Sequence, residues 1–135
     1  MLSETPPTPR RRPLVGLPLA WAAFILVSTL TPAADMPLTP RWELLSFDTA
    51  AHAGVFGVLT VLAIFSARRQ RRLGWLRTHA FRVALALAVV LGALVEVLQH
   101  LLAMGRHGEW SDLFSDALGA AAGTAFMWFT RRFWQ

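Results

Sequence analysis

Three polar side chains, Glu96, Gln99 and His100, interrupt a long apolar stretch of this sequence, AFRVALALAVVLGALVEVLQHLLAMG. Carboxylates and imidazoles carry much of the general acid–base chemistry of proteins, and both also bind cations and hydrogen-bond donors. An ionisable group within an apolar span is costly and usually marks a functional site. Glu96 is therefore the first candidate for a binding or acid–base residue.

Other polar residues are spaced so that they can join Glu96. Asp48 and His52 are four residues apart and would share one face of a helix, as would Asp112 and Asp116. Asp112 is also suited to be the N-cap of the last helix. The predicted ligand-binding set is Asp48, His52, Glu96, Gln99, Arg106, Asp112 and Asp116. A catalytic role is undecided, with Glu96 and His52 as candidates.

Four apolar segments must position these residues. The chain is 55% hydrophobic and only 16% charged, more apolar than a soluble domain. We expect membrane spans at about 14–31, 49–67, 81–104 and 112–130, each near the ~20 residues that cross a hydrocarbon core. The predicted fold is all-α: a four-helix transmembrane bundle over residues 14–132, after a disordered cytoplasmic tail at residues 1–13.

The arginines set the expected orientation. If the N-terminus is cytoplasmic, every arginine except Arg41 and Arg106 lies on the cytoplasmic side. Both termini are then cytoplasmic, in a multi-pass protein of the bacterial inner membrane. The net charge of +5 does not indicate a nucleic-acid partner, because these arginines flank apolar spans. A cleaved signal peptide is the alternative for residues 14–30, although that run is long for a signal-peptide core.

This topology brings the polar residues to a similar depth in the outer half of the bundle. His52 and Asp116 lie one turn, ~6 Å, inside the outer ends of their helices, and Glu96 lies ~20 Å above the inner interface. We expect Arg106 to pair with Glu96 or Asp112. We expect His52 to pair with Glu96 or Asp116. The set would form a polar pocket that opens outward.

Structural roles are the alternative for each residue taken alone. Asp48 and Asp112 could cap helices, and Arg106 could anchor the chain at the interface. Gln99 and His100 could hydrogen-bond between helices. The glycines are predicted to serve close helix packing: Gly54, Gly57, Gly119 and Gly123.

The same residues carry a resemblance to the VanZ-like family of small bacterial membrane proteins. That family has Asp–x–x–x–His opening one span, Glu–x–x–Gln near the end of the next, then an Arg and, six residues on, an Asp. The matching segments here are DTAAHAGVFGVL, VEVLQ and RHGEWSDLFSDALGA, which together cover most of residues 28–125. Where the family usually has asparagine, four residues after the Asp, this chain has Asp116, which adds a carboxyl group to an acidic cluster.

The resemblance implies a cell-envelope function. The family takes its name from a protein associated with resistance to teicoplanin-type glycopeptides, acting without remodelling of the peptidoglycan stem. For this chain it implies a membrane protein that could influence glycopeptide susceptibility, and it does not imply a reaction.

Three kinds of function remain open. The pocket could bind a lipid headgroup, a lipid-linked cell-wall precursor or a lipopeptide, with Arg106 taking an anionic group. A membrane-embedded enzyme could use Glu96 and His52 for acid–base chemistry on a lipid-linked substrate. A structural or partner-modulating protein would need neither.

Other classes find less support. No cofactor or metal is expected: there is no cysteine and no HExxH-type spacing, although a site from His52, Glu96, His100 and Asp116 is conceivable. Ion transport is disfavoured in a monomer because the inner halves of the spans are apolar. The partners expected are the lipid bilayer and a lipid-linked precursor or a lipopeptide. The sequence leaves the oligomeric state open.

Overall fold

The computed structural model describes residues 14–31, 47–102 and 110–134, apart from the side chain of Asp48. Its long helices are α1 (Gly16–Leu30), α2 (Phe47–Arg68), α4 (Ala80–Leu102) and α5 (Trp110–Phe129). Two short helices are α3 (Gly74–Thr78) and α6 (Arg131–Trp134). Helices account for all the regular structure in the described ranges, so the all-α prediction is confirmed.

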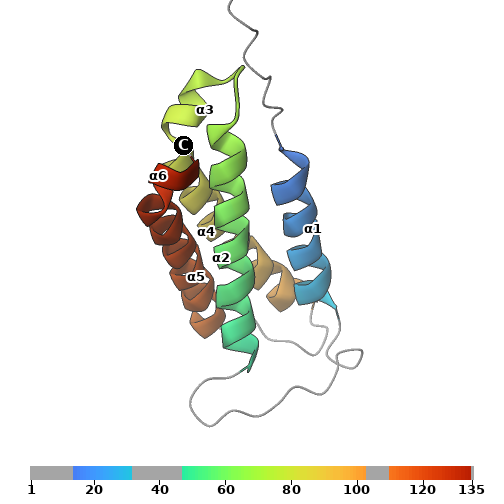
Figure 1. Cartoon of the computed structure of the whole chain (residues 1–135). Helices are drawn as coiled ribbons and strands as arrows, with labels where there is room; N and C mark the ends of the chain where they lie inside the picture. The colour runs from blue at the N-terminus through green and yellow to red at the C-terminus, as the bar shows by residue number, and fades with distance from the viewer. Residues whose placement is uncertain (1–13, 32–46, 103–109, 135) are drawn as a thin grey trace, which may run out of the picture.

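The long helices run alternately in opposite directions (Figure 1). Their bounds agree with the predicted spans to within about two residues wherever the chain is described, the usual uncertainty of helix ends. The short helices α3 and α6 were not predicted, because segments of four or five residues carry no usable hydrophobic period. The predicted tail at residues 1–13 lies outside the described residues.

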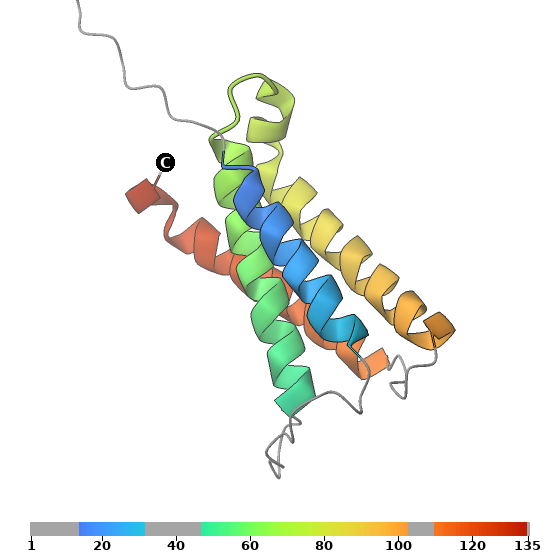
Figure 2. The ribbon, with the colours of Figure 1, turned by 90° about the vertical axis from the view of Figure 1, so that its right-hand side faces the viewer.

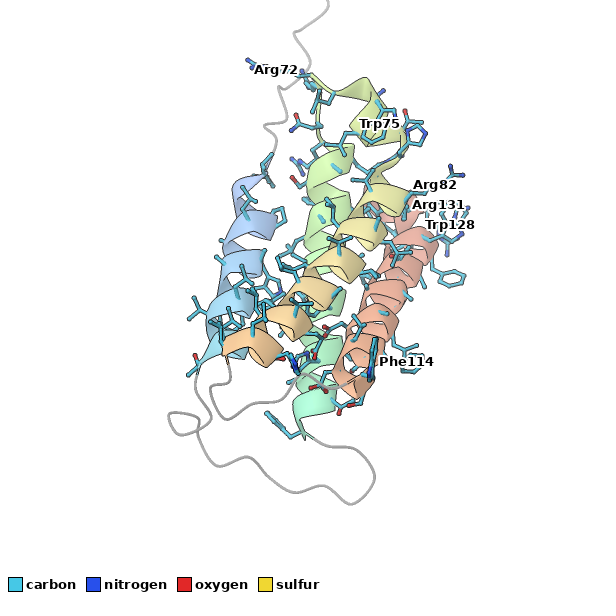
Figure 3. All side chains as sticks on the ribbon, turned by 180° about the vertical axis from the view of Figure 1, so that it is seen from behind. Arg72, Trp75, Arg82, Phe114, Trp128 and Arg131 are labelled. Atoms are coloured by element: carbon cyan, nitrogen blue, oxygen red, sulfur yellow. The ribbon has the colours of Figure 1, made fainter. Side chains whose placement is uncertain are left out.

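The two ends of the bundle differ in their side chains. One end, called here the arginine end, comprises the end of α2, α3, the start of α4 and α6. Its charged residues are Arg68, Arg69, Arg71, Arg72, Arg77, Arg82, Arg131 and Arg132. Figure 3 shows Arg72, Arg82 and Arg131 there, with Phe114 toward the opposite end. That opposite end, where α2 and α5 begin and α4 finishes, carries His52, Glu96 and Asp116 and is called the site end.

Apolar side chains cover the outside of the bundle. Val27, Leu87, Val90, Leu101 and Phe126 are all exposed, whereas the buried set includes several polar side chains. Those buried polar side chains are Thr29, His52, Thr60, Ser66, Gln99, Asp112, Ser115 and Asp116. In water this distribution would be unfavourable, because exposed apolar area is costly and buried polar groups need partners. An apolar exterior around a partly polar interior suits a lipid environment.

Two helices of the described chain are long and apolar enough to cross a membrane: Thr49–Arg68 and Ala80–Leu102. In their apolar windows only 39% and 22% of the residues are buried, which argues against the core helices of a soluble domain. The apolar helix α1 is shorter, with 15 residues. The helix α5 has 20 residues but is not among the candidate spans, and it carries two acidic residues, Asp112 and Asp116.

Close backbone contact joins α2 to α5, which cross at an angle (Figure 2). A Cβ atom on Gly123 would lie 2.5 Å from the Gly57 carbonyl oxygen, and one on Gly57 would lie 3.2 Å from that of Gly119. A Cβ on Gly119 would overlap the Ala53 carbonyl group. The predicted packing role is confirmed for these three glycines. It is wrong for Gly54, whose Cβ would meet no atom within 4 Å.

Candidate functional site

His52 and Asp116 form a buried pair between α2 and α5. The His52 Nδ1 lies 2.9 Å from the Asp116 Oδ1, and the side chains are only 3% and 0% exposed. When the carboxyl group is ionised, the imidazole N–H donates to the carboxylate oxygen. A carboxylate on Nδ1 fixes the orientation of the ring and directs Nε2 to any third group. The predicted pairing of His52 with Asp116 is therefore confirmed.

Asp116 also contacts α4, through the bare backbone of Gly92. A Cβ on Gly92 would lie 2.9 Å from the Asp116 Oδ2 and 3.2 Å from the Asp116 Cβ. A Cβ atom at this position would require the buried Asp116 side chain to shift by a few tenths of an ångström. The Oδ2 atom is buried and has no hydrogen-bond partner within the residues described. Gly92 was not a predicted site residue, although it precedes Glu96 by four residues and so shares its helix face.

Glu96 completes the cluster from α4. One ligand atom each from His52, Glu96 and Asp116 can be chosen so that all lie within 4.8 Å of one another. Glu96 is half-buried, in contrast to the two buried members. Three helices thus bring a histidine and two carboxylates together, as expected from their similar predicted depth. We refer to these three residues as the polar cluster.

A groove between α4 and α5 lies beside the polar cluster and shares Glu96 with it. Its volume is about 520 Å³, within the usual range for small-molecule sites. It is lined by Ala93, Glu96, Val97, His100, Leu101, Trp110 and Leu113. The walls are mostly apolar, and Trp110 is 87% exposed beside it. Glu96 belongs to both the groove and the polar cluster, and it is the one residue that the two share.

Gln99 connects α4 to α1. Its Nε2 donates to the Thr29 carbonyl oxygen at 2.9 Å, and the side chain is buried. The Thr29 hydroxyl donates to the carbonyl oxygen of Ile25 at 2.7 Å in turn. The interhelical role that we considered for Gln99 is therefore confirmed for its amide nitrogen. Its Oε1 has no hydrogen-bond partner in the described ranges.

Asp112 and Ser115 hold the start of α5. Asp112 is buried, but it is the third residue of α5, so the N-cap prediction is wrong. A carboxylate in the first turn still interacts favourably with the helix dipole. The Ser115 hydroxyl donates to the Thr49 carbonyl oxygen at 2.5 Å, which ties α5 to α2. Sequence reasoning missed this contact, because a carbonyl acceptor leaves no signal in the residue types.

Two further residues of the predicted site are Arg106 and Asp48. Arg106 and its expected pairing with Glu96 or Asp112 lie outside the described residues, as does the side chain of Asp48. His100, which we considered as a metal ligand, is exposed and lines the groove.

The described chain is thus an all-helical bundle with an apolar exterior and a buried polar cluster at one end, which supports a membrane protein. Comparison with known families makes the assignment specific. The VanZ/LLP1 family model matches residues 14–131, and the chain belongs to this family. No curated protein and no solved structure matches it.

Proposed function

We propose that this protein is a four-span inner-membrane protein with cytoplasmic termini that binds an amphiphilic cell-envelope molecule at the site end. The ligand is a lipid headgroup, a lipid-linked cell-wall precursor or a lipopeptide. The observation that carries the proposal is the shared position of Glu96, which lines an apolar groove and also belongs to the polar cluster. A molecule with an apolar chain and a polar head matches both parts.

The groove favours access from the lipid phase. Its apolar walls, from α4 and α5, are continuous with exposed side chains such as Leu101 and Trp110. Within the described residues the side chains with polar groups that line it are Glu96, His100 and Trp110, and the two carboxylate oxygens of Glu96 are buried. An anionic part of the ligand would be held by Arg106, as the sequence predicts.

Charge supports the orientation. All arginines of the described ranges lie at the arginine end, which is therefore the cytoplasmic end under the positive-inside rule. The site end then faces the outer leaflet, where cell-wall precursors and lipopeptides are met. The exposed apolar faces of all four long helices support spans at α1, which is apolar but has only 15 residues, and at α5, which is not among the candidate spans.

Native mass spectrometry in a mild detergent tests the proposal. The wild type should retain an amphiphile that Val97→Trp loses, because the larger side chain fills the groove. Val90→Trp is the matched control: Val90 is exposed on α4 but does not line the groove. Equal retention by all three proteins, or none by the wild type, would contradict the proposal.

An effect on susceptibility to teicoplanin-type glycopeptides follows from the family resemblance. Expression of the wild type in a susceptible host should change the minimal inhibitory concentration of teicoplanin. Glu96→Gln and Val97→Trp, at matched abundance, should reduce that change. A change that persists in both variants would separate the phenotype from the groove.

Acid–base catalysis is the second candidate, and the bond between His52 and Asp116 favours it. A carboxylate on Nδ1 orients an imidazole as a general base, and Glu96 lies in the same cluster. A nucleophile is harder to assign, because the Ser115 hydroxyl already donates to a carbonyl oxygen. If the protein is an enzyme, the wild type should convert the retained amphiphile and the Glu96→Gln variant should not. If the protein only binds the amphiphile, both should leave it chemically unchanged.

A further inference from the structure

We propose that His52, Glu96 and Asp116 form a binding site for one divalent transition-metal ion of the zinc type. The proposal depends on the packing of α2, α4 and α5 and is independent of the amphiphile. It assigns a metal site that the sequence spacing does not indicate, because each ligand comes from a different helix.

The donor set and its dimensions fit such an ion. One imidazole and two carboxylates are ligands that Zn²⁺ and its neighbours accept. Ligand atoms bound at ~2.0–2.2 Å around a tetrahedral ion lie ~3.3–3.6 Å apart, so atoms already within 4.8 Å need to approach by at most about 1.5 Å.

Asp116 supplies an independent observation. Its side chain is fully buried, and its Oδ2 has no hydrogen-bond partner within the described ranges. That atom faces α4 at Gly92, one turn from Glu96 on the same helix face. A buried carboxylate oxygen without a donor is unfavourable, and a bound cation would satisfy it.

The net charge of the three side chains also favours a bound cation. With both carboxyl groups ionised, His52, Glu96 and Asp116 together are negative even if the imidazole is protonated. A divalent cation offsets this charge and joins three helices at one point. Three protein ligands would also leave the fourth position of a tetrahedral ion for water or a substrate, as in catalytic zinc sites.

Metal content and thermal unfolding test the proposal on the full-length protein without an affinity tag. After chelation and dialysis, Zn²⁺ should restore about one bound ion per chain by elemental analysis. At a free concentration of a hundred times Kd, Zn²⁺ should raise the unfolding temperature by about 8 °C. Mn²⁺ and Mg²⁺ serve as probes of selectivity, with Mg²⁺ expected to have the smallest effect.

Two isosteric variants and one control decide the assignment. Asp116→Asn and Glu96→Gln should each lose the ion and the shift, whereas His100→Gln, which removes an exposed groove histidine, should keep both. If Asp116→Asn does not fold, Glu96→Gln decides. The proposal is overturned if folded wild type binds no ion, or if both variants bind it as the wild type does. Retention of the amphiphile without metal would overturn this site alone, and metal without the amphiphile would overturn only the proposed ligand function.

Discussion

The two ends of the bundle differ in how far their ionisable side chains are exposed. At the arginine end the charged side chains are mostly exposed and contact rings and carbonyl groups. The Arg131 guanidinium lies 3.8 Å from the centre of the Trp128 ring, and the Arg68 Nη1 donates to the Arg77 carbonyl oxygen at 3.1 Å. At the site end, His52 and Asp116 are buried and bond to each other across two helices.

Exposed and buried charges suit the two ends of the bundle to different functions. Exposed arginines interact weakly with any one partner, and their sum sets orientation and attracts anionic headgroups. A basic recess of about 480 Å³ lined by Arg68, Arg69, Arg71 and Arg77 fits that role. Buried ionisable groups require a defined geometry, which is the property of a site. The comparison can be tested by substitutions at both ends, from the largest expected change in stability to the smallest.

Closing the gap between α2 and α5 should have the largest effect. Gly119→Ala places a Cβ atom against the Ala53 carbonyl group, next to His52, and the backbone cannot yield easily. We expect a loss of about 4–5 kcal/mol in the free energy of unfolding, because overpacking against a backbone group is among the most destabilising changes. The matched control is Gly54→Ala, with open space around it, which should be neutral or stabilise by up to about 1 kcal/mol. Reversible unfolding in mixed detergent measures both, and equal effects would contradict the described packing.

Breaking the buried pair should come next. His52→Ala and Asp116→Ala should each lower the free energy of unfolding by about 2–4 kcal/mol, because the remaining partner stays buried. In a double-mutant cycle the coupling energy between the two should be about 2 kcal/mol. A coupling energy near zero would mean that the pair does not stabilise the bundle.

The corresponding pair at the arginine end should couple weakly. A cycle with Arg131→Gln and Trp128→Leu tests the cation–π contact between two exposed side chains. We expect a coupling energy below about 1 kcal/mol, and smaller still at high salt. If it equalled the coupling between His52 and Asp116, the proposed contrast between the two ends would fail.

The orientation test should change stability least. The natural chain contains no cysteine, so single Thr78→Cys and Ser111→Cys substitutions report on the two ends without background. In intact cells an impermeant maleimide should label Ser111→Cys and not Thr78→Cys. Replacing Arg68, Arg69, Arg71 and Arg72 by glutamine should increase labelling at Thr78→Cys with little change in the unfolding free energy. The opposite labelling would place the site end in the cytoplasm.

Much of the fold could be predicted from sequence because its signals are local. Apolar runs of span length located the long helices, and the spacing of four between polar residues gave shared faces. The similar depth of the polar residues predicted that His52 pairs with Glu96 or Asp116, and the structure shows the bond to Asp116. The N-cap prediction for Asp112 failed because α5 begins two residues earlier, which the apolar pattern alone does not fix.

The details of the site depended on atoms that residue types do not reveal. Gln99 and Ser115 donate to main-chain carbonyl oxygens of Thr29 and Thr49, and any residue could supply those acceptors. The role of Gly92 depends on the carboxyl group of Asp116 from another helix. The groove is formed jointly by side chains of α4 and α5, which a helix-by-helix pattern does not specify.

The most direct test of the ligand site is photo-crosslinking in the native membrane. A photoreactive amino acid at Val97, in the groove, is compared with one at Val90, which is equally apolar and exposed on α4. We predict that Val97 captures a defined amphiphile, identified by mass spectrometry, and that Glu96→Gln reduces its yield. Val90 should capture bulk phospholipid only. Identical adducts at both positions, unaffected by Glu96→Gln, would contradict a ligand site at this end of the bundle.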